Sequence, residues 1–393
     1  MQFLFSTVIY LLIFGLSILL IHQAAKYDSM NKRALSSFAL LLSVIILCLV
    51  AAYRSTDVGT DTKIYYWAYQ RAKVLSFSSY IKEMGVKYEL GFMLVVYWAT
   101  KLFDTFSGVL FVLEFLAVYP IARLAIKNSN IYSATLFFAC YLFMFYNMTF
   151  NPIRQMIAAS LVLSAFFLLE DNHKISGIVI LLLACFFHKS AVVGVLLTMI
   201  SRTIGNLRSI TSKLLIYGIV PFVIVLLLLN TNGIMRILVS HNVLSSSSWF
   251  ISTFNDSLSS NFTGIGGYDI VYLIIKLMFL AVPLITHTYD ISKNTNRDNS
   301  VNYIFVFSTV AYAAIYIVFR TMYAYRITII GEFFVIPYLS ISDKRPAWVR
   351  IKKNVFPLKD FLVTMLLPIT WFVLYMCFNY QGTNNLSFIQ LLR

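Results

Sequence analysis

The charged and polar residues that are expected to do chemistry fall in four short segments in the first half of the chain. These segments read R-S-T-D-V-G-T-D-T from Arg54, Y-E-L-G-F around Glu89, N-P-I-R-Q around Arg154 and F-F-H-K-S-A around His188. Arginine can hold phosphate groups, and carboxylates or an imidazole can move a proton. The four segments therefore predict a site that combines anion binding with acid–base chemistry.

Seven further candidates lie inside these segments, just after the first of them, or nearer the end of the chain, namely Asp57, Asp61, Tyr65, Tyr66, Gln155, Arg320 and Arg326. Each has a structural alternative, because an arginine beside a span can extend to the headgroups, an aspartate can cap a helix, and a tyrosine can anchor an interface. Arg154 differs from the others, because the helix dipole disfavours a cation on a first helical turn. Its position favours a role in binding or catalysis.

The stretches around these segments are apolar enough to cross a membrane. Of the 393 residues, 60% are apolar and 12% are charged, and the mean hydropathy is +0.79. Continuous apolar runs of about 18 residues favour spanning helices, which satisfy their own backbone groups in lipid. We predict an all-α polytopic membrane protein with about 12 transmembrane helices in a single membrane domain, residues 1–393. The expected spans are 3–22, 35–53, 107–122, 131–149, 153–170, 174–187, 189–201, 213–230, 268–288, 301–319, 323–341 and 361–379.

Basic residues in the loops orient these spans. The most basic loop, 342–360, is predicted to be cytoplasmic by the positive-inside rule. Counting back along the chain then puts two large loops, 54–106 and 231–267, on the outer face. Residues 89–103 are apolar enough to span, but a span there would move the next basic loop to the wrong side. We expect 89–103 to form an outer interfacial helix, and all four polar segments to meet at that face.

Several classes of function are disfavoured by what the sequence contains. The net charge of +15 lies in short loops between spans, which indicates contacts with membrane lipid and no nucleic-acid partner. The four cysteines fall inside apolar runs, and no close carboxylate pair of the form D-x-D is present. Neither a phosphate-binding loop nor a dinucleotide fingerprint occurs. We therefore predict no metal and no cofactor.

The four segments, in this order, resemble the EpsG/Wzy group of polysaccharide polymerases. Leu90 in Y-E-L-G-F is a departure, because such proteins often have proline there, and residues after Ala191 resemble the group only loosely. The resemblance implies a GT-C-like membrane glycosyltransferase that joins oligosaccharide repeat units carried on undecaprenyl pyrophosphate. It further implies a bacterial cytoplasmic membrane, a site facing the periplasm or cell exterior, and a chain-length regulator as a protein partner.

A lipid pyrophosphate is a good leaving group, so such an enzyme needs cations on the phosphates and a base for the acceptor hydroxyl. We expect Arg154, with Arg320 or Arg326, to grip the pyrophosphate. Asp61, Glu89 and His188 compete for the role of base, and His188 is favoured as base or phosphate partner. Asp61 and Glu89 could instead orient the arginines or bind sugar hydroxyls. The remaining candidates, Arg54, Asp57, Tyr65, Tyr66 and Gln155, are expected to bind substrate.

Two other classes of function fit parts of the sequence. A flippase for the same lipid-linked oligosaccharide would also need a basic cavity and many helices, but transporters more often have repeated halves and helices broken at mid-membrane. A membrane acyltransferase could use His188, although no paired His and Asp on one helix supports it.

Overall fold

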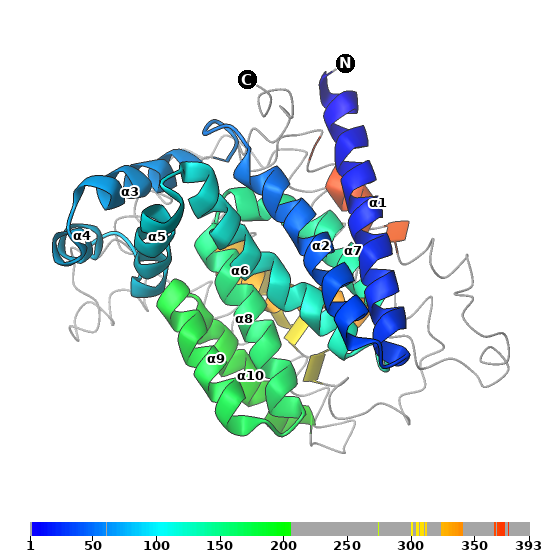
Figure 1. Ribbon diagram of the computed structural model, residues 1–393. Coiled ribbons are helices and arrows are strands. Elements are labelled where there is room, and N and C mark those ends of the chain that lie inside the picture. The colour runs from blue at the N-terminus through cyan, green and yellow to red at the C-terminus, as the bar shows by residue number, and fades with distance from the viewer. Residues whose placement is uncertain are drawn as a thin grey trace, which may run out of the picture.

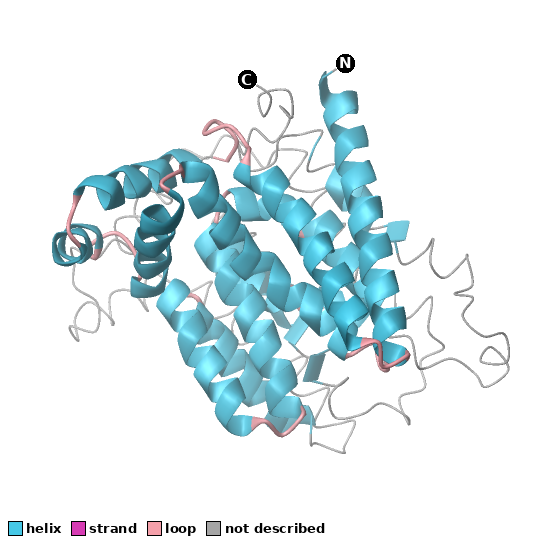
Figure 2. Ribbon diagram, viewed as in Figure 1, coloured by secondary structure: helices cyan, strands magenta, loops and turns pink. Residues whose placement is uncertain are grey.

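The computed structural model describes residues 2–59, 61–205 and 324–340, with short helical pieces between residues 274 and 376. Throughout these residues the regular elements are helices, as predicted (Figure 2). The chain order of the main elements is α1 Gln2–Ser29, α2 Arg33–Ala52, α3 Thr62–Val74, α4 Phe77–Met84, α5 Leu90–Phe103, α6 Phe106–Lys127, α7 Ala134–Met144, the 3-10 helix η1 Tyr146–Phe150, α8 Ile153–Glu170, α9 Lys174–Phe187, α10 Ala191–Gly205, α16 Ala324–Glu332 and α17 Val335–Ser340.

Four of the described helices are long and apolar enough to cross a membrane, namely α1, α2, α6 and α8. They correspond to the predicted spans 3–22, 35–53, 107–122 and 153–170, so the helical membrane fold is confirmed for them. The total of about 12 spans stays a prediction. The predicted spans after residue 205, apart from 323–341, lie wholly or mainly outside the described residues, as do the loops 231–267 and 342–360.

The centre of the bundle is α8, against which α6 and α9 pack (Figure 1). In its most apolar window 72% of the residues are buried, compared with 28% for α1, which lies at the periphery. Small residues such as Ala158 and Ala159 allow close helix approach, and the hydroxyl of Ser160 donates a hydrogen bond to the carbonyl of Ala117 on α6 at 2.7 Å. Helix α8 is therefore a firm support for the residues at its start.

The predicted span 131–149 is wrong as one continuous helix. Helix α7 ends at Met144, and η1 follows as a tighter 3-10 turn. Two features explain the break. Pro152 has no N–H to donate to the carbonyl of Met148. The hydroxyl of Thr149 donates a hydrogen bond to the carbonyl of Tyr146 at 2.6 Å. The interruption brings polar side chains of η1 into the interior of the bundle.

The predicted span 323–341 is likewise divided, into α16 and α17. The break falls at Phe333 and Phe334, and Pro337 removes the N–H that would bond the carbonyl of Phe333 in a continuous α-helix. The N–H of Ile336 bonds that carbonyl instead, at 3.1 Å. Hydropathy does not register either proline, which is why both spans were expected to be continuous.

The segment 54–106, predicted as an outer loop with one helix, contains three. Helix α5 matches the expected 89–103, while α3 and α4 were not predicted (Figure 1). The ion pair of Arg71 with Glu83 at 2.6 Å joins α3 to α4, and Lys73 pairs with Asp104 at 2.9 Å beyond the end of α5. The depth of α5 in the membrane stays a prediction.

Candidate functional site

The first and third polar segments are bonded to each other. Gly59 has φ +86°, and a Cβ there would meet the carbonyl oxygen of Phe150 at 2.0 Å, so this turn requires glycine. The hydroxyl of Thr62 lies 3.2 Å from the same carbonyl, and the backbone N–H of Asp61 donates to Oδ1 of Asn151 at 3.0 Å. The turn after α2 is therefore fixed onto the chain that leads into α8.

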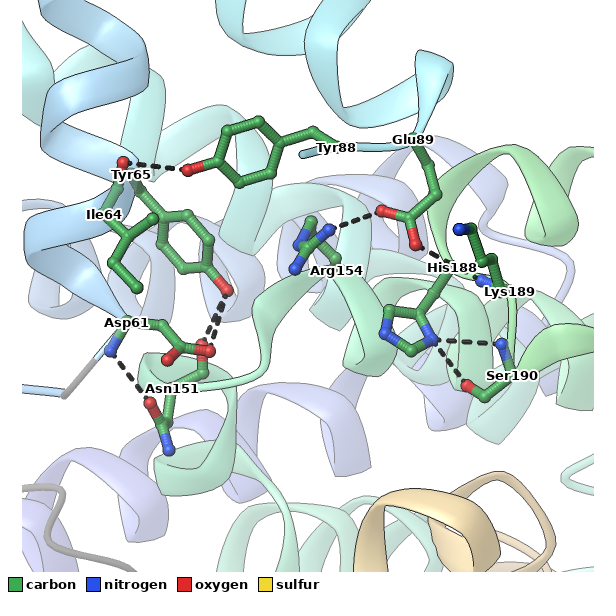
Figure 3. A network of polar contacts seen from close by, with 10 residues as sticks. All are labelled: Asp61, Ile64, Tyr65, Tyr88, Glu89, Asn151, Arg154, His188, Lys189 and Ser190. Carbon is green, nitrogen blue, oxygen red and sulfur yellow. Dashed lines mark hydrogen bonds and ion pairs between the residues drawn. The ribbon is translucent and has the colours of Figure 1, made fainter. Parts of the chain in front are cut away.

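Two tyrosines continue this contact toward α5 (Figure 3). The Tyr65 hydroxyl donates to the carbonyl of Asn151 at 2.9 Å and lies 3.5 Å from Oδ2 of Asp61. Its ring packs against Phe92, whose other neighbour is the ring of Tyr88. The Tyr88 hydroxyl in turn donates to the carbonyl of Ile64 at 3.3 Å. These aromatic side chains join the first and second segments.

Arg154, on the first turn of α8, lies at the middle of this assembly (Figure 3). Its Nη1 forms an ion pair with Oε2 of Glu89 at 2.5 Å, and its guanidinium lies over the rings of Tyr88 and Phe92. Glu89 stands at the N-cap position of α5 but makes no side-chain cap bond. The carboxylate and the aromatic faces thus offset the unfavourable position of a cation at a helix start.

The fourth segment reaches the same carboxylate. The backbone N–H of Lys189 donates to Oε1 of Glu89 at 3.4 Å, so both oxygens of Glu89 have a partner. The close contact of α5 with α9 requires Gly91, because a Cβ at this position would lie 2.8 Å from the carbonyl oxygen of Phe186 at the end of α9. Segments that are up to about a hundred residues apart in sequence therefore meet at Glu89.

The surroundings of His188 fix the position of its proton. The backbone N–H of Ser190 donates to Nδ1 at 3.1 Å, and the Ser190 hydroxyl lies 2.7 Å from the same nitrogen. Gln155 donates from Nε2 to that hydroxyl at 3.1 Å. Because Nδ1 accepts a hydrogen bond from an N–H group, the neutral ring carries its proton on Nε2. The imidazole is thus arranged to donate a hydrogen bond from Nε2.

A second arginine and carboxylate lie deeper in the bundle. Arg54 is 6% exposed, its Nη1 donates to the carbonyl of Ala51 at 3.0 Å, and its guanidinium covers the ring of Phe150. Its Nε and Nη2 have no hydrogen-bond partner among the residues that the structure describes. Glu114 on α6 is completely buried, and both of its oxygens lie within hydrogen-bond distance of the Thr149 hydroxyl, at 2.8 and 2.9 Å. The charge of Glu114 acts on Arg54 without direct pairing.

Two predicted residues do not join the assembly around Arg154. Asp57 is 52% exposed and pairs with Lys63 at 2.9 Å, and the hydrogen bond from Lys63 lowers the pKa of this carboxyl. Tyr66 is 40% exposed, packs on Phe106 and accepts a hydrogen bond from Gln70. Arg320 and the side chain of Arg326 lie outside the described residues.

Five contributors were not singled out from the sequence. Tyr88, Asn151 and Ser190 lie inside the four polar segments, but they are uncharged, and nothing in the sequence distinguishes them from ordinary polar residues. Glu114 did give one, because it is the single charged residue in the predicted span 107–122 and an acid within a span is costly unless it has a partner. Thr149, which bonds Glu114, could be identified only from the structure.

Comparison with known proteins gives one result that covers most of the chain. A sequence model of the EpsG family matches residues 37–390, a range that includes all four polar segments. No match is found among curated proteins or among solved structures.

Proposed function

Because the chain belongs to the EpsG family, we propose that it is a membrane glycosyltransferase that joins oligosaccharide repeat units carried on undecaprenyl pyrophosphate. Family membership implies a polysaccharide polymerase role in general, and the long apolar helices indicate a membrane protein. The observation that carries the finer proposal is the meeting of the four polar segments around Arg154 (Figure 3). A lipid pyrophosphate donor requires such a cation close to acid–base groups.

Arg154 holds the pyrophosphate in this proposal, together with Arg320 or Arg326. Its planar guanidinium can bond two phosphate oxygens at once, and it keeps its charge in a partly buried site. The side chain is 21% exposed, so a substrate can reach it, while Glu89 at 12% exposure orients it from behind. Glu89 acts as a positioning residue, since both of its oxygens already bond the protein.

Asp61 is the base that we favour, because His188 and Glu89 are engaged in ways that suit other roles. The acceptor hydroxyl oxygen bonds the anomeric carbon, the bond from that carbon to the pyrophosphate oxygen breaks, and its electron pair leaves with the phosphate. The hydroxyl proton passes to Asp61. His188 donates from Nε2 to a phosphate oxygen. A positioned base contributes about 10²–10⁴-fold.

Arg54 binds a polar group of the substrate, and Glu114 keeps its charge compensated. A buried N–H without a partner costs about 1–3 kcal/mol, so Nε and Nη2 of Arg54 suit an oxygen-rich ligand. Tyr65 and Gln155 act as positioning residues, because the Tyr65 hydroxyl bonds the carbonyl of Asn151 and the Gln155 amide bonds the hydroxyl of Ser190. Asp57 and Tyr66 contact sugar groups at the exposed edge of the site, away from the bond that reacts.

We place the site on the outer face of the bacterial cytoplasmic membrane. Support comes from α2, which begins with Arg33 and ends two residues before Arg54. Its 20 residues cover about 30 Å, the thickness of the hydrocarbon core. The basic end at Arg33 then faces the cytoplasm. A chain-length regulator remains the expected protein partner.

The test is polymer formation by Arg154→Ala and Arg154→Lys in a host that lacks its own polymerase. Both variants should reach the membrane at normal levels, Arg154→Ala should give single repeat units only, and Arg154→Lys should retain partial activity. Arg71→Ala is the matched control, since Arg71 forms a half-exposed ion pair between α3 and α4 that involves none of the four polar segments. Long polymer from Arg154→Ala would contradict the proposal.

A purified-protein assay separates the rival activities. Protein in vesicles is given lipid-linked repeat units, and chain elongation and movement of the lipid across the bilayer are measured in parallel. The proposal requires elongation. Translocation without elongation would identify a flippase.

A further inference from the structure

A cavity lies at the opposite end of the bundle from Arg154, where α1 ends, α2 begins and α6 ends. Its volume is about 420 Å³. Arg33 on the first turn of α2 and Arg123 and Lys127 on the last turns of α6 line it, together with the hydroxyls of Ser36 and Ser37. None of the four polar segments contributes to it. The cavity is therefore separate from the proposed polymerase site.

The charge of the cavity is positive and only partly neutralised. Three cations line it against a single carboxylate, that of Asp28. Lys127 pairs with Asp171 at 2.9 Å, outside the lining. Arg33 and Arg123 form no ion pair with any carboxylate in the part of the chain that the structure describes. Two arginines and two serines thus line one cavity, and their guanidinium and hydroxyl groups suit a phosphate.

The position of the cavity relates it to the membrane surface. Arg33 begins the apolar helix α2, which is a candidate span, and Lys127 ends the candidate span α6. Ends of spanning helices lie at the depth of the lipid headgroups. A phosphate at this depth belongs naturally to a phospholipid, although a free phosphate ion would present the same oxygens.

The apolar part of the lining favours the lipid. Leu40 on α2 and Ile126 on α6 are buried and complete the lining beside the cations. Apolar side chains next to the cations suit the part of a phospholipid that joins its headgroup to its acyl chains. A free phosphate would use the cations but gain nothing from these apolar side chains.

We propose that this cavity is a binding site for the headgroup of an anionic phospholipid, with Arg33 and Arg123 on the phosphate. The hydroxyls of Ser36 and Ser37 donate to the remaining oxygens, and Leu40 and Ile126 contact the start of the acyl chains. Basic pockets between spanning helices are suited to such headgroups. This lipid site does not depend on the polymerase reaction, so the two proposals can be tested separately.

Native mass spectrometry of the purified full-length protein tests this proposal. Protein in mild detergent is mixed with phosphatidylglycerol, with phosphatidylcholine of the same acyl chains, or with inorganic phosphate at equal phosphate concentration. We expect phosphatidylglycerol to bind about tenfold more tightly than phosphatidylcholine, a difference on the order of one charge-assisted hydrogen bond. Inorganic phosphate should not displace it. Equal binding of the two lipids, or displacement by phosphate, would overturn the lipid site.

Variants then locate the binding. Arg33→Gln with Arg123→Gln should abolish the preference for phosphatidylglycerol, whereas the lysine pair Arg33→Lys with Arg123→Lys should keep part of it. The matched control is Lys26→Gln with Lys32→Gln, which removes the same charge at the same end of the bundle but outside the cavity. An equal loss in this control would mean that surface charge attracts the lipid, and the assigned cavity would be wrong. Should the glutamine pair not fold, the comparison of the lysine pair with the control decides.

Discussion

Two arginines of the protein are each combined with a carboxylate from another helix, but in different ways. Arg154 and Glu89 are in direct contact and remain partly accessible, at 21% and 12% exposure. Arg54 and Glu114 are buried, at 6% and 0%, and Glu114 bonds Thr149 in place of the arginine. The direct pair lies at the start of α8, and the separated pair lies inside the bundle.

The difference shows what each pair can do. A pair that substrate can reach can exchange its carboxylate for a phosphate, because the cation keeps an anionic partner throughout. The buried pair cannot exchange partners in this way. Arg54 can bond a substrate group through Nε and Nη2, but loss of Glu114 would leave the arginine charge uncompensated in the interior of the bundle. We therefore expect changes at the Arg154 site to reduce activity and changes at Glu114 to reduce stability.

The largest expected effect follows from replacing the proposed base. Asp61→Asn keeps the size of the side chain and the backbone bond to Asn151, but it removes the proton acceptor. The kcat for chain elongation should fall about 10²–10⁴-fold with little change in thermal unfolding. A variant with normal kcat would transfer the role of base to Glu89 or His188.

Glu114→Ala should be the most destabilising change. It leaves the Arg54 cation buried without compensation, which costs about 3–5 kcal/mol, and it removes one of the hydrogen-bond partners of the Thr149 hydroxyl. Thermal unfolding of the purified protein measures the effect, with Glu114→Gln as the variant that retains the hydrogen bond. Loss of activity at unchanged stability would instead place Glu114 among the reacting groups.

Glu89→Gln should have a smaller effect, on substrate binding and not on stability. The change releases the Arg154 guanidinium, so the KM for the lipid-linked donor should rise about tenfold while kcat changes less. Glu89→Asp, which keeps the charge on a shorter side chain, should lie between Glu89→Gln and the wild type. A fall in kcat at constant KM would argue that Glu89 is itself the base.

Asp57→Asn should produce the smallest effect and serves as the matched control for Asp61→Asn. The pair with Lys63 is exposed and lowers the pKa of Asp57, so any stabilisation is present above the usual aspartate pKa and fades as the pH falls through the lowered one. We expect normal kcat and an unchanged unfolding temperature at pH 7. A lower kcat would mean that Asp57 itself takes part in the reaction.

Much of this arrangement could be predicted from the sequence. Long apolar runs specify α2, α6 and α8, because burial in lipid overrides local propensity, and α5 was expected within one residue of its observed start. Helices α3 and α4 were missed because polar, amphipathic segments carry little hydropathy signal. The breaks before α8 and within 323–341 depend on single prolines, which an average over a window does not register.

The pairing of charges could not be predicted in the same way. Arg154 was recognised as unusual because its helix position is unfavourable, but its partner Glu89 comes from a helix 65 residues earlier in the chain. Which carboxylate meets which arginine depends on how α5, α8 and α9 pack. The tautomer of His188 depends on the turn formed by Ser190, and it shifts the balance from a base toward a phosphate partner.

The central claim is that Arg154 binds the lipid pyrophosphate. The most direct measurement is the Kd of purified wild type, Arg154→Ala and Arg71→Ala for undecaprenyl pyrophosphate without sugar, because this separates binding from catalysis. The account predicts at least about tenfold weaker binding for Arg154→Ala and no change for Arg71→Ala. Equal affinity in all three proteins would contradict it.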